Sequence, residues 1–263
     1  MTTRNDFANP FRRALAGKKV LTGIWSMLNS TNAIEGLGWA GFDWLVIDAE
    51  HSPVSLHDAM AHLRALGATP TIPVVRLPWN DNVLIKHYLD IGAQTIMLPL
   101  IQNAREAQAA VRAMRYPPGG MRGFAAMHRA SRYGHIPQYV ERAEETLFMI
   151  VQVETVEALD RLDEIASVEG VDAVFFGPGD LSASMGLLGK PGQTEVFDRI
   201  VEASKTVQRL GKSTGVLAPS IGHAKSYCSA GVNFVSVATD CALLFRNADA
   251  LAADFAAFTA AAT

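Results

Sequence analysis

Two acidic side chains, Glu154 and Asp180, each follow a short apolar segment of the kind that forms buried strands. They are separated by about one strand–helix unit, so neighbouring parallel strands would place both carboxylates at one edge of a sheet. Unpaired carboxylates in contact repel, and each raises the pKa of the other. A divalent cation would remove this conflict, and oxygen ligands suit Mg²⁺ or Mn²⁺. The pair therefore indicates a metal site, unless each carboxylate caps a helix or pairs with an arginine.

Arg76 and His51 could act on a substrate beside such a metal. Arg76 ends an apolar segment, where a cation is costly unless it meets an anion such as a carboxylate or a developing enolate oxygen. A salt bridge from Arg76 to Glu50 or Glu154 is the alternative. His51 follows Asp48 and Glu50 in the sequence, and a histidine can transfer a proton near pH 7 when a carboxylate orients it. A structural or surface histidine is the other interpretation.

The segment Gly177–Ser182, with the sequence GPGDLS, is typical of a turn that opens a short helix. Its two glycines would let a ligand approach the backbone amides closely, and the start of a helix favours an anion. A substrate carboxylate could bind there beside the metal. A plain helix cap by Asp180 or Ser182 is the alternative.

Eight short apolar segments, rich in β-branched residues, are predicted to be the strands that position these groups. They are Val20–Trp25, Asp43–Asp48, Thr71–Arg76, Thr95–Leu98, Leu147–Glu154, Val171–Gly177, Ser213–Leu217 and Phe234–Ala238. Amphipathic segments between them predict helices at Ala33–Ala40, Leu56–Leu66, Asn82–Ile91, Ala104–Met114, Val156–Ile165, Glu195–Leu210 and Ile221–Ala230. Glycine follows most of these helices and can supply the left-handed turn that ends them.

Eight strand–helix units predict one domain over residues 1–263, of class α/β, folded as a (β/α)8 TIM barrel. An open doubly wound sheet is the alternative, but no glycine-rich phosphate-binding turn follows the first strand. In a barrel, function gathers where the strands end, at the carboxyl-terminal mouth. The polar residues above all follow strands, so they should share that rim.

The composition narrows the possible functions. Lys and Arg total 23 against 26 Asp and Glu, for a net charge of −3, so neither nucleic acid nor a membrane surface is an expected partner. The two cysteines cannot frame a disulfide scaffold, and neither a secretory signal nor a long apolar run is evident, so we expect a cytoplasmic protein. No lysine ends a strand, which disfavours a Schiff-base aldolase.

Two segments exceed what a minimal barrel needs. The connection between Leu98 and Leu147 is unusually long, and such loops are often lids, binding loops or interfaces. Its Arg122 and Arg129 could meet a substrate carboxylate, or could be solvated or lie at an interface. The alanine-rich stretch Asp249–Ala262 predicts a last helix that covers its own barrel or a neighbour's.

Several motifs together resemble the HpcH/HpaI aldolase family. They are Gly23-Ile24-Trp25, Asp48-Ala49-Glu50-His51, Val75-Arg76, the PPGGMRG segment with its Arg-Ala-Ser, Gln152-Val153-Glu154 and GPGDLS. The resemblance spans about Phe11 to Phe255. It implies a metal-dependent, pyruvate-forming aldolase that cleaves 4-hydroxy-2-oxo acids, with Mg²⁺, Mn²⁺ or Co²⁺ as cofactor and a role in aromatic-compound catabolism. It also implies a homohexamer, a trimer of dimers, whose last helix is exchanged between subunits.

The resemblance implies a role for each site residue. Glu154 and Asp180 match the metal ligands, and the backbone around Gly177–Ser182 matches the site of the pyruvate carboxylate. The catalytic matches are His51, Arg76, Asp48 and Asp90, of which Asp90 resembles an aspartate that pairs with the histidine across a subunit contact. The matches for substrate binding are Arg76, Gln152, Gly177, Pro178, Ser182, Trp25 and Leu217.

Two other functions remain compatible with these residues. The same site would serve an oxaloacetate decarboxylase or a citramalyl-type carbon–carbon lyase, because a pyruvate enolate is common to all of them. A non-catalytic barrel that binds a metal and an oxo acid is an alternative of another class. Small oxo acids, pyruvate and aldehydes are the expected small-molecule partners.

Overall fold

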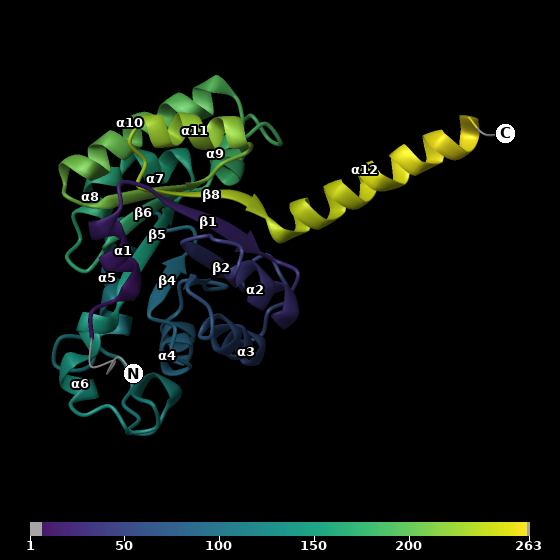
Figure 1. Ribbon diagram of the computed structural model, residues 1–263. Helices are drawn as coiled ribbons and strands as arrows, with labels where there is room; N and C mark the ends of the chain where they lie inside the picture. The colour runs from purple at the N-terminus through teal and green to yellow at the C-terminus, as the bar shows by residue number, and fades with distance from the viewer. Residues whose placement is uncertain (1–6, 262–263) are drawn as a thin grey trace.

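The computed structural model describes residues 7–261 and contains a closed barrel of parallel strands (Figure 1). The strands are β1 (Leu21–Ser26), β2 (Trp44–Asp48), β3 (Ile72–Arg76), β4 (Thr95–Leu98), β5 (Phe148–Val153), β6 (Ala173–Phe176), β7 (Ser213–Leu217) and β8 (Phe234–Thr239). Each strand pairs with the next along the chain, and β8 closes the barrel on β1. The predicted (β/α)8 barrel is thereby confirmed, and the strand bounds agree with the predicted ones to within a residue or two.

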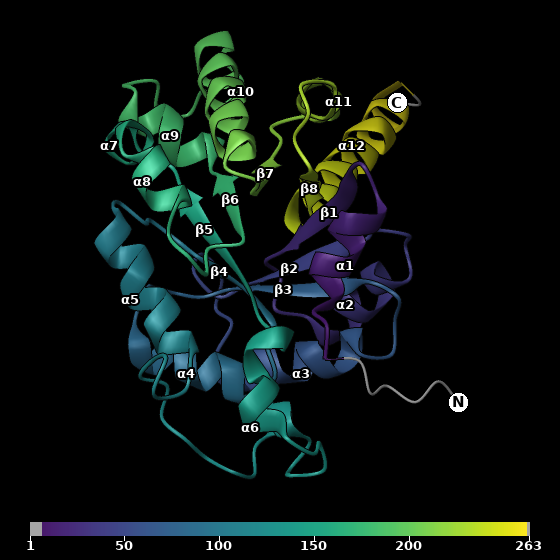
Figure 2. The same cartoon turned by 90° about the vertical axis from the view of Figure 1, so that its left-hand side faces the viewer.

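The helices lie outside the strands, as Figure 2 shows in a view turned by 90°. They are α2 (Thr31–Gly38), α3 (Leu56–Leu66), α4 (Asn82–Asp90), α5 (Ala104–Met114), α7 (Val156–Asp160), α8 (Leu162–Ala166), α9 (Pro178–Ser184), α10 (Thr194–Arg209) and α11 (Ile221–Ser229). Both faces of the sheet are therefore buried, which is why the strands are continuously apolar instead of alternating. The predicted helix over Val156–Ile165 is divided into α7 and α8, because the backbone at Arg161 is not helical.

An additional helix, α1 (Pro10–Gly17), closes the amino-terminal end of the barrel. Asn9 caps it by accepting hydrogen bonds from the backbone amides of Phe11 and Arg12 at 2.9 and 3.1 Å. Phe11 is fully buried, and its ring packs edge-on against Trp44 and Phe234 with ring centres 6.0 and 5.3 Å apart. These aromatic residues fill the amino-terminal end of the barrel interior. A ligand would therefore enter through the carboxyl-terminal mouth.

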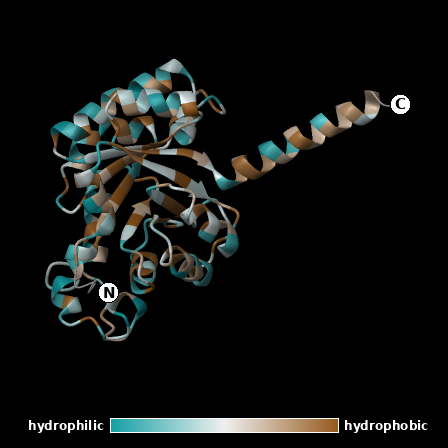
Figure 3. Cartoon of the chain, in the orientation of Figure 1, coloured by the Kyte–Doolittle hydropathy of each residue, from teal (hydrophilic) through white to brown (hydrophobic). Residues whose placement is uncertain are grey.

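The last helix, α12 (Asp240–Ala261), leaves the barrel and extends away from it (Figure 1). It begins well before the predicted start at Asp249, because β8 runs directly into it; the predicted end at Ala262 lies outside the described residues. Figure 3 shows apolar residues along its length. Exposed apolar side chains on this helix are Leu243, Leu244, Phe245, Leu251, Phe255 and Phe258. Within residues 7–261, no helix is long and apolar enough to span a bilayer.

The long connection between β4 and β5 is ordered into short elements. After α5 it contains a 3-10 turn η1 (Arg129–Ser131), the helix α6 (Tyr139–Arg142) and a second 3-10 turn η2 (Ala143–Thr146). Tyr116, Tyr139 and Ala143 form a small buried cluster that holds these pieces together. The connection therefore forms a separate lobe beside α4, visible in teal below the barrel in Figure 1.

Candidate active site

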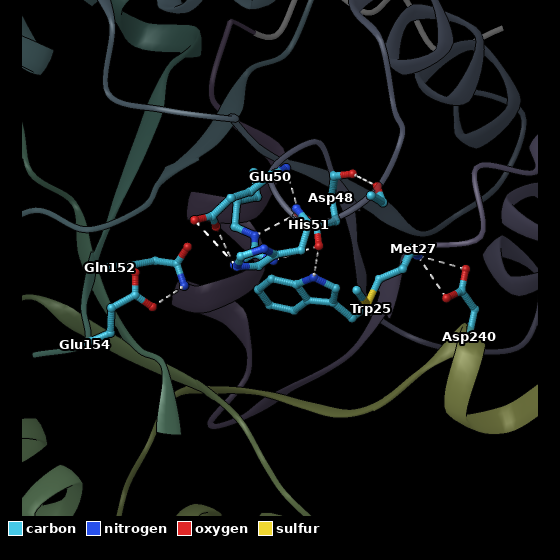
Figure 4. A network of polar contacts seen from close by, with 10 residues as sticks. Trp25, Met27, Asp48, Glu50, His51, Gln152, Glu154 and Asp240 are labelled. Atoms are coloured by element: carbon cyan, nitrogen blue, oxygen red, sulfur yellow. Dashed lines mark hydrogen bonds and ion pairs between the residues drawn. The ribbon is translucent and has the colours of Figure 1, made fainter. Parts of the chain in front are cut away.

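Polar side chains from β2, β3 and β5 converge at the carboxyl-terminal mouth (Figure 4). Asp48 ends β2 and lies opposite Arg76, which ends β3, in the strand register. Gln152 is on β5, and Glu154 is the first residue after that strand. Both side chains are almost fully buried. Asp180 is in the first turn of α9, after β6. The barrel thus brings together the groups that the sequence placed at the ends of separate strands.

Arg76 is the centre of the polar network at the mouth. Its Nε and Nη2 donate to Asp48 Oδ1 and Oδ2 at 2.9 and 2.7 Å, and its Nη1 forms an ion pair with Glu50 Oε2 at 2.7 Å. The guanidinium also lies over the ring of Trp25, 4.8 Å from the ring centre. Both carboxylates and the indole hold the guanidinium in one plane, so its orientation toward the mouth is set before any substrate arrives.

Asp48 acts as the support of Arg76. It is fully buried and also accepts hydrogen bonds from Trp25 Nε1 and from the backbone amide of Glu50. Burial alone would raise the pKa of Asp48, but the hydrogen bonds and charge of Arg76 outweigh it and lower the pKa below its usual range. Asp48 therefore stays ionised and keeps Arg76 in place.

The ring of His51 is nearest to Glu50 and not to Asp48. His51 Nε2 lies 3.7 Å from Glu50 Oε1, and the side chain is 58% exposed. Asp48 reaches only the backbone amide of His51, at 3.3 Å. Glu50 thus contacts both Arg76 and His51, although no catalytic or binding role was predicted for it. Its position two residues after the end of β2, between Asp48 and His51, was the available signal.

Glu154 is a buried carboxylate with an unusual proton affinity. It is 2% exposed, and its Oε1 accepts a hydrogen bond from the backbone amide of Leu100 at 2.9 Å. Burial raises its pKa to about 7, and the negative charges of Asp180 and Glu50 add to the increase against the opposing effect of the Leu100 amide. A Cβ on Gly177 would lie 2.3 Å from Glu154 Oε2, so only glycine permits this close approach of β6 to the carboxylate.

The donor set at the mouth fits a hard divalent cation. The carboxylates of Glu154 and Asp180 repel each other, and Gln152 Oε1 is buried without a hydrogen-bond partner among the described residues. Within residues 7–261, no three acidic, histidine or cysteine side chains converge closely enough to hold an ion by themselves. An ion held by Glu154 and Asp180 would therefore keep positions open for water and substrate, as hard ions commonly do.

The remaining predicted substrate-binding residues lie around the same opening. Trp25 and Leu217, from β1 and β7, belong to the apolar cluster inside the barrel. Gly177 is the N-cap of α9 and Pro178 its first residue; no side chain caps this helix, which removes the helix-cap alternative for Asp180 and Ser182. Ser182 is fully buried, and its hydroxyl donates to the carbonyl of Gly179 at 2.7 Å.

Asp90 does not join this group within one chain. It is the last residue of α4, and its Oδ1 accepts a hydrogen bond from Arg122 Nη2 at 2.7 Å. No hydrogen bond or ion pair between Asp90 and His51 is found among the described residues. Arg122, one of the two arginines that could have met a substrate carboxylate, is instead buried against Asp90.

A cavity of about 540 Å³ lies at the amino-terminal end of the barrel, opposite the mouth. Its lining includes Pro10 of α1, Ile72 at the start of β3, and Arg129 and Tyr139 of the long connection. None of the mouth residues borders it, so the chemistry suggested by the sequence is not located there.

The chain is similar to known proteins over nearly its whole length. Residues 21–247 match the profile of the HpcH/HpaI aldolase/citrate lyase family. The chain is 46% identical over 250 residues to 4-hydroxy-2-oxo-heptane-1,7-dioate aldolase of Shigella sonnei (strain Ss046), covering 95% of each. It is 47% identical over 248 residues to the pyruvate aldolase of Rhizobium etli, covering 94% of the chain and 98% of the relative. A crystal structure of an HpcH/HpaI aldolase/citrate lyase family protein from Burkholderia cenocepacia superposes with a TM-score of 0.90 at 36% identity, covering 94% of this chain and 99% of that one.

Proposed function

The chain belongs to the HpcH/HpaI aldolase/citrate lyase family, and we propose that it is a metal-dependent class II pyruvate aldolase that reversibly cleaves 4-hydroxy-2-oxo acids to pyruvate and an aldehyde. The observation that carries the proposal is the fixed guanidinium of Arg76 beside the carboxylates of Glu154 and Glu50. Formation of an enolate requires groups that stabilise its developing negative charge. A positively charged hydrogen-bond donor and a metal ion held by neighbouring carboxylates would both do so.

Glu154 and Asp180 would hold the divalent ion beside Gln152, whose Nε2 donates to Glu154 Oε2 at 3.2 Å (Figure 4). When bound, the ion would supply Lewis-acid polarisation of the substrate's keto group. The 2-oxo acid would lie with its carboxylate at the backbone of Gly177–Ser182, lined by Trp25 and Leu217. Mg²⁺, Mn²⁺ and Co²⁺ all suit these oxygen donors.

Arg76 would donate hydrogen bonds to the keto oxygen and stabilise the negative charge that develops there. His51 would accept the proton of the 4-hydroxyl group, directly or through a water. The C3–C4 bond then breaks, its electron pair forms the enolate of pyruvate, and the aldehyde leaves. Protonation of C3 completes pyruvate, and the reverse sequence is aldol addition. Asp48 holds Arg76 throughout, by the two hydrogen bonds described above.

A second copy of the chain would complete the acid–base pair. The His51 side chain is 58% exposed and lies 3.7 Å from Glu50, and Asp90 is 23% exposed without an ion pair to His51 among the described residues. We propose that Asp90 of a neighbouring subunit pairs with His51 in a cytoplasmic homohexamer of single-domain subunits. Exchange of α12 between subunits would cover its exposed apolar residues, since helices of this kind need a partner surface.

Removal of divalent metal is the direct test of the proposed reaction. Activity toward a 4-hydroxy-2-oxo acid, followed by coupled pyruvate detection, should fall after dialysis against EDTA and return on addition of Mg²⁺, Mn²⁺ or Co²⁺. Full activity in EDTA, together with borohydride trapping of pyruvate on a lysine, would contradict it.

Parallel assays with oxaloacetate and citramalyl-type substrates distinguish related lyases. Absence of metal-dependent deuterium exchange at C3 of pyruvate would indicate a binding protein.

Charges placed on α12 test the helix exchange. Phe255 and Phe258 are 65% and 66% exposed in the isolated chain, so aspartate at both positions would cost little in a monomer. In an oligomer that buries α12, the same double variant should sediment as a smaller species in analytical ultracentrifugation. Leu188→Asp, at an 81% exposed position on the barrel, is the control. Unchanged sedimentation of the Phe255→Asp/Phe258→Asp variant would refute the exchange.

A further inference from the structure

We propose that Arg122 is a positioning residue, which holds the carboxylate of Asp90 at the subunit surface in the orientation needed by the histidine of a neighbouring subunit. The inference deepens the proposed function and rests on its pairing of Asp90 with His51 between subunits. Arg122 is a buried cation in the lobe of the long connection, away from the mouth of its own barrel.

Arg122 is buried to a degree that is unusual for arginine. Its side chain is 0% exposed, and the guanidinium lies over the ring of Tyr116, 4.5 Å from the ring centre. Nη2 donates to Asp90 Oδ1 at 2.7 Å, whereas Nε and Nη1 have no hydrogen-bond partner among the described residues. Burying a cation is costly without a counter-charge. Asp90 supplies that charge from the end of α4.

The other members of the cluster limit how Asp90 can move. The backbone amide of Ser131 donates to His128 Nδ1 at 3.2 Å, which leaves the proton of a neutral imidazole on Nε2. That Nε2 lies 3.3 Å from the hydroxyl of Tyr116 and 3.7 Å from Asp90 Oδ1. Burial lowers the pKa of His128, although the charge of Asp90 opposes this effect. The cluster thus presents one cation and one neutral ring to a single carboxylate oxygen.

Asp90 is the member of this cluster that reaches the surface. Its side chain is 23% exposed, against 0% for Arg122 and 9% for His128. Oδ1 faces the buried donors, and no hydrogen bond to Oδ2 is found among the described residues. A carboxylate that is fixed through one oxygen can offer the other to a donor on another molecule. An ordinary surface aspartate would not need a fully buried arginine beneath it.

The backbone ensures that Arg122 arrives at this position. Met121 and Arg122 donate their amides to the carbonyls of Arg112 and Arg115 at 2.7 and 2.9 Å, so the loop folds back on the end of α5. A Cβ on Gly120 would lie 2.3 Å from the carbonyl oxygen of Arg115, so the turn requires glycine. The segment after α5 therefore places the guanidinium of Arg122 beside Asp90, at the end of the adjacent helix α4.

A double-mutant cycle between Arg122→Met and Asp90→Asn tests the inference. We expect each single variant to lower kcat for oxo-acid cleavage roughly tenfold to a hundredfold, the scale of a lost hydrogen bond to a charged group, with KM nearly unchanged. The double variant should be no worse than Asp90→Asn alone, because Arg122 acts through Asp90. Arg122→Lys should restore part of kcat. Arg115→Met, which removes a surface arginine bound to Glu144 at 3.1 Å, is the matched control.

The possible results separate this inference from the proposed function. If Asp90→Asn lowers kcat and Arg122→Met does not, Arg122 has no positioning role, while the pairing of Asp90 with His51 stands. If Asp90→Asn leaves kcat unchanged while cleavage remains metal-dependent, the intersubunit pairing is wrong and this inference falls with it. If the losses of kcat in the two single variants add in the double variant, Arg122 does not act through Asp90. If kcat falls only in variants whose thermal stability also falls, the role of Arg122 is purely structural. Should Arg122→Met fail to fold by circular dichroism, Arg122→Lys is judged by the same criteria.

Discussion

Replacement of Arg76 by alanine should lower kcat/KM for cleavage of a 4-hydroxy-2-oxo acid by about 10²- to 10³-fold, with most of the loss in kcat. The guanidinium is already aligned by Asp48 and Glu50, so its interaction with the keto oxygen strengthens as negative charge develops there. Without it, the developing enolate would face an excess of carboxylates. Steady-state kinetics with saturating Mg²⁺ or Mn²⁺ measures the effect.

Two further variants show whether the loss is specific. Arg76→Lys keeps a positive charge but cannot donate two parallel hydrogen bonds to Asp48, so we expect an intermediate activity. Arg12→Ala removes an arginine that bridges to Asp172 at 2.8 Å on the opposite end of the barrel, and it should leave kcat unchanged. An Arg76→Ala variant that folds and retains activity within about threefold of the parent would exclude Arg76 from transition-state stabilisation.

Replacement of Glu154 by glutamine should abolish metal binding and lower activity by roughly 10³-fold or more, since a lost Lewis acid removes several kcal/mol of stabilisation. Glutamine keeps the shape and can still accept the hydrogen bond from the Leu100 amide, so the fold should be retained. Isothermal titration with Mn²⁺ and the cleavage assay measure the two effects. Glu157→Gln, on the exposed face of α7, is the matched control.

The pH dependence of metal binding gives the Glu154 prediction a second readout. In the metal-free chain the pKa of Glu154 is raised to about 7, chiefly by burial, so a proton competes with the cation. Affinity for Mn²⁺ should therefore weaken as the pH falls below about 7 and level off above it. Affinity that is independent of pH between about 5 and 8 would argue against Glu154 as a ligand.

Local patterns in the sequence were sufficient to predict the barrel and its rim. Continuous apolar segments, such as the one that ends at Asp48, indicate strands that are buried on both faces. The amphipathic segments between them indicate the helices that cover the barrel. Because every strand in such a barrel points the same way, a polar residue after any strand must lie at the mouth. Arg76, Glu154 and Asp180 could therefore be grouped without coordinates.

The sequence by itself thus determined the strand order and which polar residues follow the strands at the carboxyl-terminal end of the barrel. Tertiary structure alone decided which of those groups touch: Arg76 takes both Asp48 and Glu50, His51 turns toward Glu50, and Asp90 is bound by Arg122. The contacts of Arg76 and of Arg122 join residues more than about 20 positions apart, whereas His51 and Glu50 are neighbours in the sequence. All of these contacts depend on strand register, side-chain rotamer and loop path. No periodicity in the sequence encodes those quantities, because they follow from packing of the whole chain.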